Sequence, residues 1–212
     1  SPELLEQGKG DIWDSGKIES DASQWITYQG KTLKRNASYY WKVKIDTNKG
    51  ATNWSAPAFW TTGLFNEANW QGQWIGLDRA APGDSETQWS RLAARYLRKE
   101  FAVKKSVKRA TVHIAGMGLY ELFINGQRIG NQVLAPAPTD YRKTILYNTY
   151  DVTSLLQTEN AIGVTLGNGR FYTMRQNYKP YKIPTFGYPK LRLNLIVEYA
   201  DGSKETITTN TS

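Results

Sequence analysis

Apolar and polar residues alternate with a period of two along most of the chain, and the clearest case is residues 119–124. Successive side chains there fall on opposite sides of an extended chain, and most are aromatic or branched, which favours a β-strand. Asn125-Gly126 follows at once, and this dipeptide accepts the two positive φ values of a type I′ turn. The pattern predicts a β-hairpin in which residues 127–129 begin the return strand.

Similar stretches fill the rest of the second half, each bounded by polar turn residues. Asp201-Gly202 marks a second hairpin turn, and residues 151–156 are predicted as a helical turn with Asp151 or Thr153 as the N-cap. About eight strands with one helical turn predict a jelly-roll sandwich. The predicted strands cover residues 96–103, 107–115, 119–124, 127–129, 145–150, 160–166, 189–199 and 204–209.

Residues 38–46 are the clearest strand of the first half. Tyr39, Trp41, Val43 and Ile45 lie on its predicted core side, opposite a more polar set. Short alternating strands between polar turns predict an all-β sandwich. There are about four or five of them, whereas an immunoglobulin-like sandwich has about seven, so we expect the missing strands upstream of Ser1. The other predicted strands cover residues 12–16, 25–28 and 58–61.

Composition and charge exclude several kinds of site and of binding partner. The 212 residues include no Cys and one His, and the formal net charge is +8. These counts exclude disulfides, thiolate sites and a poly-His metal centre. The charge raises a nucleic-acid hypothesis, but the basic residues are scattered, and those between 95 and 108 alternate with apolar residues as on solvated strands. We therefore predict neither a nucleic-acid partner nor, since no apolar run is long enough, a membrane span.

Two ordered sets of short motifs run along the chain. The first set is Trp13-Asp14-Ser15-Gly16-Lys17, Tyr39-Tyr40-Trp41-Lys42-Val43, Trp54-Ser55 and Phe59-Trp60-Thr61-Thr62-Gly63. The second set is Gly118-Leu119-Tyr120-Glu121, Ile124-Asn125-Gly126, Leu134-Ala135-Pro136, Thr139-Asp140-Tyr141, Thr149-Tyr150-Asp151-Val152-Thr153, Asn160-Ala161-Ile162-Gly163 and Leu166-Gly167-Asn168-Gly169. The second set resembles the N-terminal β-domain of bacterial α-L-rhamnosidases of glycoside hydrolase family 78, and the first resembles the fibronectin-type-III-like domain that precedes it.

This resemblance implies the domain organisation. Residues 1–63 are predicted as an incomplete immunoglobulin/fibronectin-III-like sandwich, residues 64–91 as a linker, and residues 92–212 as a jelly-roll, galactose-binding-like β-sandwich. The fold class is therefore predicted as all-β. The Trp residues of the linker, among them Trp70 and Trp74, have two interpretations: a platform for the C–H face of a sugar, or buried packing between domains.

The resemblance also implies a function. Enzymes of this family carry a downstream (α/α)6 barrel in which a pair of carboxylates hydrolyses the glycosidic bond with inversion. No helical periodicity of that kind occurs here, so we predict a non-catalytic fragment of an α-L-rhamnosidase. The implied partners are a rhamnose-containing glycan and the barrel, and the implied location is outside the cytoplasm. The rival hypothesis is a stand-alone carbohydrate-binding or adhesin module.

The jelly roll is similar to family 67 carbohydrate-binding modules, which implies two ligands to consider, terminal L-rhamnose and a calcium ion. A hard cation needs oxygen ligands, and a sugar needs hydrogen-bonding groups beside an aromatic wall. Two long loops offer these groups. Residues 134–142 contain one carboxylate, Asp140, and residues 167–188 contain several amide, guanidinium and phenol groups. From these loops we predict the sugar-binding residues Asp140, Asn168, Arg170 and Tyr172.

Each candidate also has a purely structural interpretation. Asp140 can close a turn, and Asn168-Gly169 can be a turn that uses left-handed geometry. The tyrosine-rich run from 172 to 188 can pack on the missing barrel. His113, in the middle of a strand with apolar neighbours, is interpreted as structural. The metal identity stays open, since the second loop has no carboxylate of its own.

Overall fold

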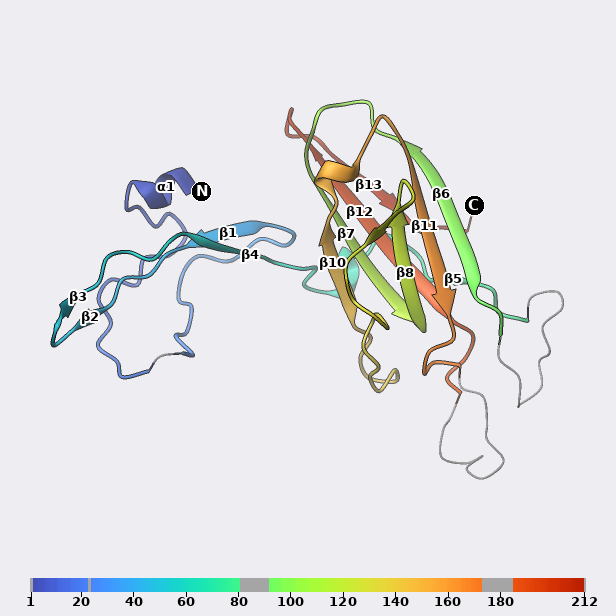
Figure 1. The fold of residues 1–212 in the computed structure, drawn as a ribbon, viewed down its shortest axis with the longest axis horizontal. Coiled ribbons are helices and arrows are strands. Elements are labelled where there is room, and N and C mark those ends of the chain that lie inside the picture. The colour runs from blue at the N-terminus through green and yellow to red at the C-terminus, as the bar shows by residue number, and fades with distance from the viewer. Residues whose placement is uncertain (1, 23, 81–91, 173–184, 212) are drawn as a thin grey trace, which may run out of the picture. The chain divides into compact units, whose positions relative to one another are not determined.

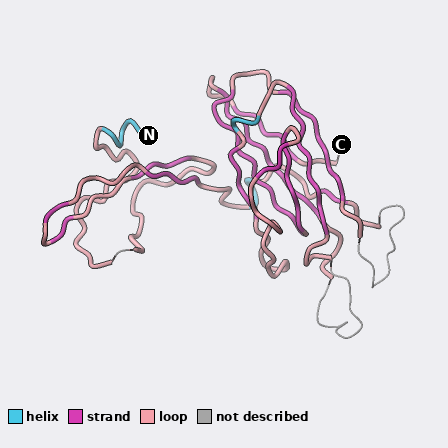
Figure 2. Tube along the Cα trace, viewed as in Figure 1, coloured by secondary structure: helices cyan, strands magenta, loops and turns pink. Residues whose placement is uncertain are grey.

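The structure, a computed structural model, describes residues 2–22, 24–80, 92–172 and 185–211. The chain divides into two compact units, unit 1 spanning Ser1–Phe65 and unit 2 spanning Asn66–Ser212. Strands make up nearly all the regular structure, and helix is confined to short pieces (Figure 2). The prediction of an all-β chain is confirmed.

Unit 1 contains two small antiparallel sheets. Strand β1 pairs with β4 in the register Tyr39↔Trp60, and β2 pairs with β3. The predicted strands at 12–16 and 25–28 are wrong, because neither segment joins a ladder of backbone hydrogen bonds and Gly16 and Trp25 have positive φ values of 58° and 65°. The elements of this unit are α1 (Pro2–Glu6), β1 (Ser38–Trp41), β2 (Asp46–Thr47), β3 (Gly50–Ala51) and β4 (Ala58–Thr61).

Unit 2 is a sandwich of two antiparallel sheets, in the orders β10-β7-β12-β13 and β6-β11-β8-β9, with β5 added to β12. Figure 1 shows the sheet containing β6, β11 and β8 lying over the other. Its elements are η1 (Glu67–Asn69), β5 (Ile75–Gly76), β6 (Arg95–Ala102), β7 (Val107–Met117), β8 (Leu119–Ile124), β9 (Gln127–Ile129), β10 (Tyr147–Asp151), η2 (Thr153–Leu155), β11 (Glu159–Gly167), β12 (Lys190–Tyr199) and β13 (Lys204–Thr208).

The core of unit 2 lies between these two sheets. The inward residues of β12 are almost fully buried, with Leu195 and Val197 at 0% exposure. They join one hydrophobic cluster with Ile114 of β7 and with Leu122 and Leu166 of the facing sheet. Burial of apolar area at about 25 cal/mol per Å² is the main stabilising contribution of such a cluster. The period-two pattern is what places these side chains on one face.

The hairpin between β8 and β9 forms at the predicted place. Asn125 and Gly126 have φ values of 51° and 81°, as a type I′ turn requires. The Asn125 side chain also donates to the Leu155 carbonyl at 2.9 Å and accepts from the Ala161 amide at 2.9 Å. Asn125 therefore shapes the turn and ties it to β11.

The predicted helical turn is present as η2, but the predicted N-cap is wrong. Val152 occupies the N-cap position, and no side chain caps the helix. Asp151 instead ends β10, where its Oδ1 accepts from the Thr153 amide at 2.9 Å. The Thr153 hydroxyl accepts from the Ala110 amide at 2.9 Å. Thr153 thus joins the turn to β7, and Asp151 holds Thr153 in place.

Part of the predicted linker belongs to unit 2. Gly72 donates its amide to Asn194 Oδ1 at 2.8 Å, and Gln73 donates to the Thr209 carbonyl at 2.8 Å. A Cβ on Gly72 would lie 2.4 Å from the Leu193 carbonyl oxygen, so only glycine permits this approach. Residues 66–76 therefore cross the outer face of the sheet that contains β12.

Candidate functional site

A half-open groove lies beside residues 66–76 on the outer face of unit 2. Its volume is about 420 Å³, and it combines aromatic with charged side chains. We call it the Trp70 groove. Its lining residues are Glu67, Trp70, Trp74, Ala115, Tyr141, Arg142, Lys143, Thr144, Ile145, Tyr147 and Arg192.

Arg192 organises one side of the Trp70 groove. Its guanidinium donates to the carbonyls of Gly72 at 2.6 Å and Trp70 at 3.3 Å, and it is bound to the Glu67 carboxylate. The same group lies 5.3 Å from the ring centroid of Trp70 and 6.0 Å from that of Trp74, within reach of cation–π attraction. Only 12% of this side chain is exposed, so Arg192 fixes both indole rings in place.

Tyr147 forms the floor between the groove and the sheet. Its ring meets Trp70 edge to face at 5.4 Å and His113 at 6.0 Å. His113 is fully buried, and its Nδ1 lies 2.9 Å from the Thr149 hydroxyl. Burial, with a smaller contribution from the positive charge of Arg109, lowers the pKa of His113 to about 4. His113 is therefore a neutral, structural residue, as interpreted from the sequence.

Asp140 is engaged within its own loop. Its carboxylate accepts from Arg142 Nε at 3.0 Å and Nη2 at 3.2 Å, and its carbonyl accepts from the amides of Lys143 and Thr144. These hydrogen bonds with Arg142 lower the pKa of Asp140. The observed contacts are those of the turn-closing interpretation, and a sugar-binding role for Asp140 stays a prediction.

The second predicted loop begins with Asn168, Arg170 and Tyr172. Asn168 donates to the Leu92 carbonyl at 2.9 Å, whereas its buried Oδ1 has no hydrogen-bond partner among the described residues. Tyr172 stacks on Tyr188 with centroids 5.7 Å apart, and Arg170 is exposed. The amide and phenol groups of residues 173–184 on this loop lie outside the described residues.

The two predicted loops meet through aromatic side chains. Tyr141, next to Asp140, contacts Phe171 at 5.2 Å and Phe186 at 5.4 Å, and the last two rings stack at 6.0 Å. Phe171 lies between Arg170 and Tyr172 in the sequence. The structure thus brings the two loops to the same end of the sandwich, with Tyr141 contributing to both this cluster and the Trp70 groove.

The described residues do not fit a calcium site. Calcium takes six to eight oxygen ligands, usually including carboxylates. No cluster of three or more His, Asp or Glu side chains occurs within the described ranges. The Asp140 carboxylate binds Arg142, and the buried Asn168 Oδ1 is a neutral amide oxygen. Nor do the described groove residues supply the acid and base that glycoside hydrolysis needs, since their one carboxylate, Glu67, binds Arg192.

Arg192 is the functional candidate that the sequence did not reveal. It lies between the buried Leu191 and Leu193 of a strand, so alternation places it on the outer face. Nothing local indicates that Trp70 covers it, because the two residues are far apart in the chain. A charged residue between two leucines of a strand is the one signal that could have marked it.

Comparisons with known proteins identify the class of this all-β chain. Residues 105–212 match the family model described as Alpha-L-rhamnosidase N-terminal domain, and residues 3–66 match Rha78A-like, N-terminal immunoglobulin domain. The chain belongs to the α-L-rhamnosidase N-terminal domain family. The family resemblance inferred from the sequence motifs is confirmed.

Individual relatives cover nearly all of the chain. An α-L-rhamnosidase from Formosa agariphila is 36% identical over 96% of this chain and 23% of the relative. The solved α-L-rhamnosidase from Dictyoglumus thermophilum is 40% identical with a TM-score of 0.82, over 98% of this chain and 23% of that one. The solved enzyme from Aspergillus terreus is 33% identical with a TM-score of 0.80, over 90% and 22%. The chain thus spans less than a quarter of the length of these relatives. No described helix is both long and apolar enough for a membrane span.

Proposed function

We propose that this chain is the non-catalytic N-terminal region of an α-L-rhamnosidase and that unit 2 supports a downstream (α/α)6 catalytic barrel. The observation that carries the proposal is the 36% identity over nearly the full chain to an enzyme more than four times longer. The parent enzyme removes terminal α-L-rhamnose from glycans or glycosides, with inversion, outside the cytoplasm.

The loop end of unit 2 is the proposed contact surface for the barrel. Val133 and Leu134, at the start of the first predicted loop, are 82% and 69% exposed. Exposed neighbouring apolar residues of this kind mark interaction surfaces. Leu134 also has a φ of 61°, which is unfavourable for leucine. A leucine kept exposed in a strained conformation supports a role in contact with another part of the protein.

The test uses the parent enzyme and its variant Leu134→Asn. Asparagine tolerates positive φ, so the variant keeps the loop while losing the apolar contact. We expect a lower melting temperature of the barrel and weaker hydrolysis of an aryl α-L-rhamnoside. The control is Lys104→Asn, an exposed residue at the opposite end of the sandwich. If both variants have the melting temperature and the hydrolysis rate of the unmodified enzyme, the proposed contact surface is wrong.

A second candidate function is direct sugar binding by unit 2, favoured by the aromatic walls of the Trp70 groove. Calorimetric titration of the chain with L-rhamnose, with calcium and then with a chelator, tests it. If L-rhamnose binds saturably and the binding is lost in Asp140→Ala, the site lies in the predicted loops. If the binding is lost in Trp74→Ala, the site is the Trp70 groove. Absence of heat in a folded chain leaves support of the barrel as the function.

A further inference from the structure

The floor of the Trp70 groove is a row of three side chains across the sheet. Tyr147 of β10 and Arg192 of β12 are both register partners of Ala115 of β7, so their side chains point to the same face. All three line the groove. Because the side chain of Ala115 is short, it leaves a hollow between its two long neighbours. The indoles of Trp70 and Trp74 line one side of this hollow.

The charged groups that line the groove are mostly cations. They are Arg142, Lys143 and Arg192, beside a single carboxylate, Glu67. Ammonium and guanidinium groups donate hydrogen bonds and accept none. The hydroxyls of a neutral sugar both donate and accept, whereas a carboxylate or a sulfate only accepts. The lining therefore matches an anionic ligand better than a neutral one.

The buried cation of the groove is already paired. The Arg192 side chain is 12% exposed and binds the Glu67 carboxylate, as a cation of low exposure requires. Its guanidinium also donates to two backbone carbonyls and lies against both indoles. Arg192 therefore holds the aromatic side of the groove, and a charged ligand would be bound by the other two cations.

Arg142 and Lys143 are available to a ligand. The Arg142 side chain is 75% exposed, and Asp140 accepts from its Nε and Nη2, which leaves further donors on a group that has five. Lys143 is exposed, and its ammonium has no partner within the part of the chain that the structure describes. The Asp140 carbonyl accepts from the amides of Lys143 and Thr144. The turn that carries both cations is therefore formed before any ligand binds.

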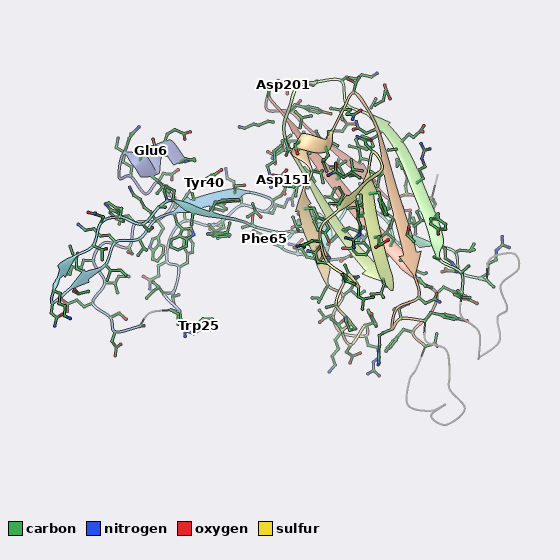
Figure 3. The ribbon with its side chains drawn as sticks, viewed as in Figure 1. Glu6, Trp25, Tyr40, Phe65, Asp151 and Asp201 are labelled. Carbon is green, nitrogen blue, oxygen red and sulfur yellow. The ribbon has the colours of Figure 1, made fainter. Side chains whose placement is uncertain are left out.

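Other carboxylates of unit 2 lie far from this turn. Figure 3 shows Asp151 and Asp201 at the opposite end of the sandwich, where β10 and β12 end. Asp151 is four residues from Tyr147 along β10, roughly 13 Å at about 3.3 Å per residue. That distance exceeds the Debye length of about 8 Å at physiological ionic strength. Neither carboxylate therefore offsets the charge of Lys143.

We propose that the Trp70 groove binds an acidic sugar, one that carries a carboxylate or a sulfate ester. Lys143 and Arg142 bind the anionic group, and the sugar ring lies against Trp70 and Trp74. Aromatic walls with a few placed polar groups are typical of sites for small ligands. This inference rests on the second candidate function, sugar binding by unit 2, and names the class of ligand. The parent enzyme would thereby favour glycans that carry negative charge.

The experiment is an NMR titration of this chain, followed through the indole N–H signals of Trp70 and Trp74. Methyl glucuronide and methyl glucoside differ by one carboxylate, and galactose 6-sulfate beside galactose tests the sulfate. We expect the acidic member of at least one pair to bind ~5-fold more tightly, as for an exposed ion pair. The difference should shrink in about 0.5 M salt, which screens the charges.

The outcomes separate this inference from the function on which it rests. Equal affinities for the acidic and the neutral sugars would overturn the anionic preference and leave sugar binding intact. If no sugar shifts either indole signal, sugar binding in the groove is wrong as well. Support of the barrel is independent of both results, because Leu134→Asn tests it separately.

Three variants test the role of charge. Lys143→Gln should weaken binding of the acidic sugar ~5-fold and leave the neutral sugar unchanged. Lys104→Gln, the same change at the opposite end of the sandwich, is the control and should have no effect. Glu67→Gln removes the one lining carboxylate, while Arg192 keeps its backbone partners, so acidic sugar should bind about twofold more tightly. An unaffected Lys143→Gln variant, or weaker binding in Glu67→Gln, would contradict the proposal.

Two other occupants of the groove give different results. A nucleotide also combines an anion with a ring that stacks on indoles, so AMP binding as tightly as the acidic sugar would overturn the assignment. The second alternative is another part of the parent enzyme. Calorimetry of the parent enzyme with the acidic sugar should show the same loss in Lys143→Gln. A parent enzyme that is insensitive to this substitution would mean that the groove is covered, and the proposal would be wrong.

Discussion

The two units obey the same sequence pattern and reach different states. In β12 the alternating residues are paired on both edges and buried against a facing sheet. In β1 they have one neighbour and no facing sheet among the described residues. The difference teaches that alternation establishes which side of a strand is apolar, whereas burial depends on the rest of the sandwich.

Leu195→Ala should have the largest effect on stability. Leu195 is fully buried between the sheets of unit 2. Truncating such a side chain lowers the free energy of unfolding by about 3 to 4 kcal/mol, because apolar burial is lost and a cavity remains. Denaturant unfolding followed by circular dichroism measures the change. A loss below about 1 kcal/mol would mean that the unit 2 core is loosely packed, and the contrast with unit 1 would disappear.

Acidification should destabilise unit 2 through His113. Its pKa is 6.5 when unperturbed and about 4 in the fold, so the unfolded state binds more protons between these values. The free energy of unfolding therefore falls as the pH decreases from 6.5 towards 4, by up to about 3 kcal/mol. His113→Gln removes this contribution while other groups still titrate. If the free energy of unfolding falls equally steeply with decreasing pH in both proteins, His113 is not neutral and buried.

Asn125→Ala should cost at least about 2 kcal/mol in unit 2. The change places alanine at a positive φ and removes side-chain hydrogen bonds to Leu155 and Ala161, each worth about 1 kcal/mol. Asn125→Gly separates the two causes, because glycine keeps the turn and loses the bonds. If both variants unfold at the same denaturant midpoint, the hydrogen bonds account for the whole effect and the backbone strain for none.

Val43→Ala should have the smallest effect in this chain. The side chain is 45% exposed on the open face of unit 1, and surface changes usually stay within about 0.5 kcal/mol. Calorimetry of the variant beside Leu195→Ala gives the direct comparison of the two units. A cost similar to that of Leu195→Ala would show that unit 1 has a closed core.

Local patterns predicted the fold where both partners of a strand are present. The hairpin at Asn125-Gly126 and the strand at residues 58–61 appear as expected. Residues 12–16 and 25–28 carry strand-like sequences, but a ladder needs a partner that a local pattern does not reveal. Asp151 failed as a cap for a related reason, since its side chain bonds Thr153 at the end of β10.

The candidate site was predicted less completely than the fold. Asp140 and Asn168 were chosen for their chemistry, and the structure brings their loops to one end of the sandwich through Tyr141 and Phe171. Arg192 was missed, because the tryptophans that it holds come from a segment predicted as a linker. Contacts between distant segments depend on sheet order, which local residue patterns do not encode.

The segment at residues 66–76 has a consequence for anyone who transplants this jelly roll into another protein. A cut at residue 92 would follow the predicted domain boundary and would remove β5 from the sheet that contains β12. It would also remove Trp70 from its contact with Tyr147 and leave Asn194 without its partners at Asn69 and Gly72. The smallest portable module therefore begins near Asn66, about 26 residues earlier than the strand pattern indicates.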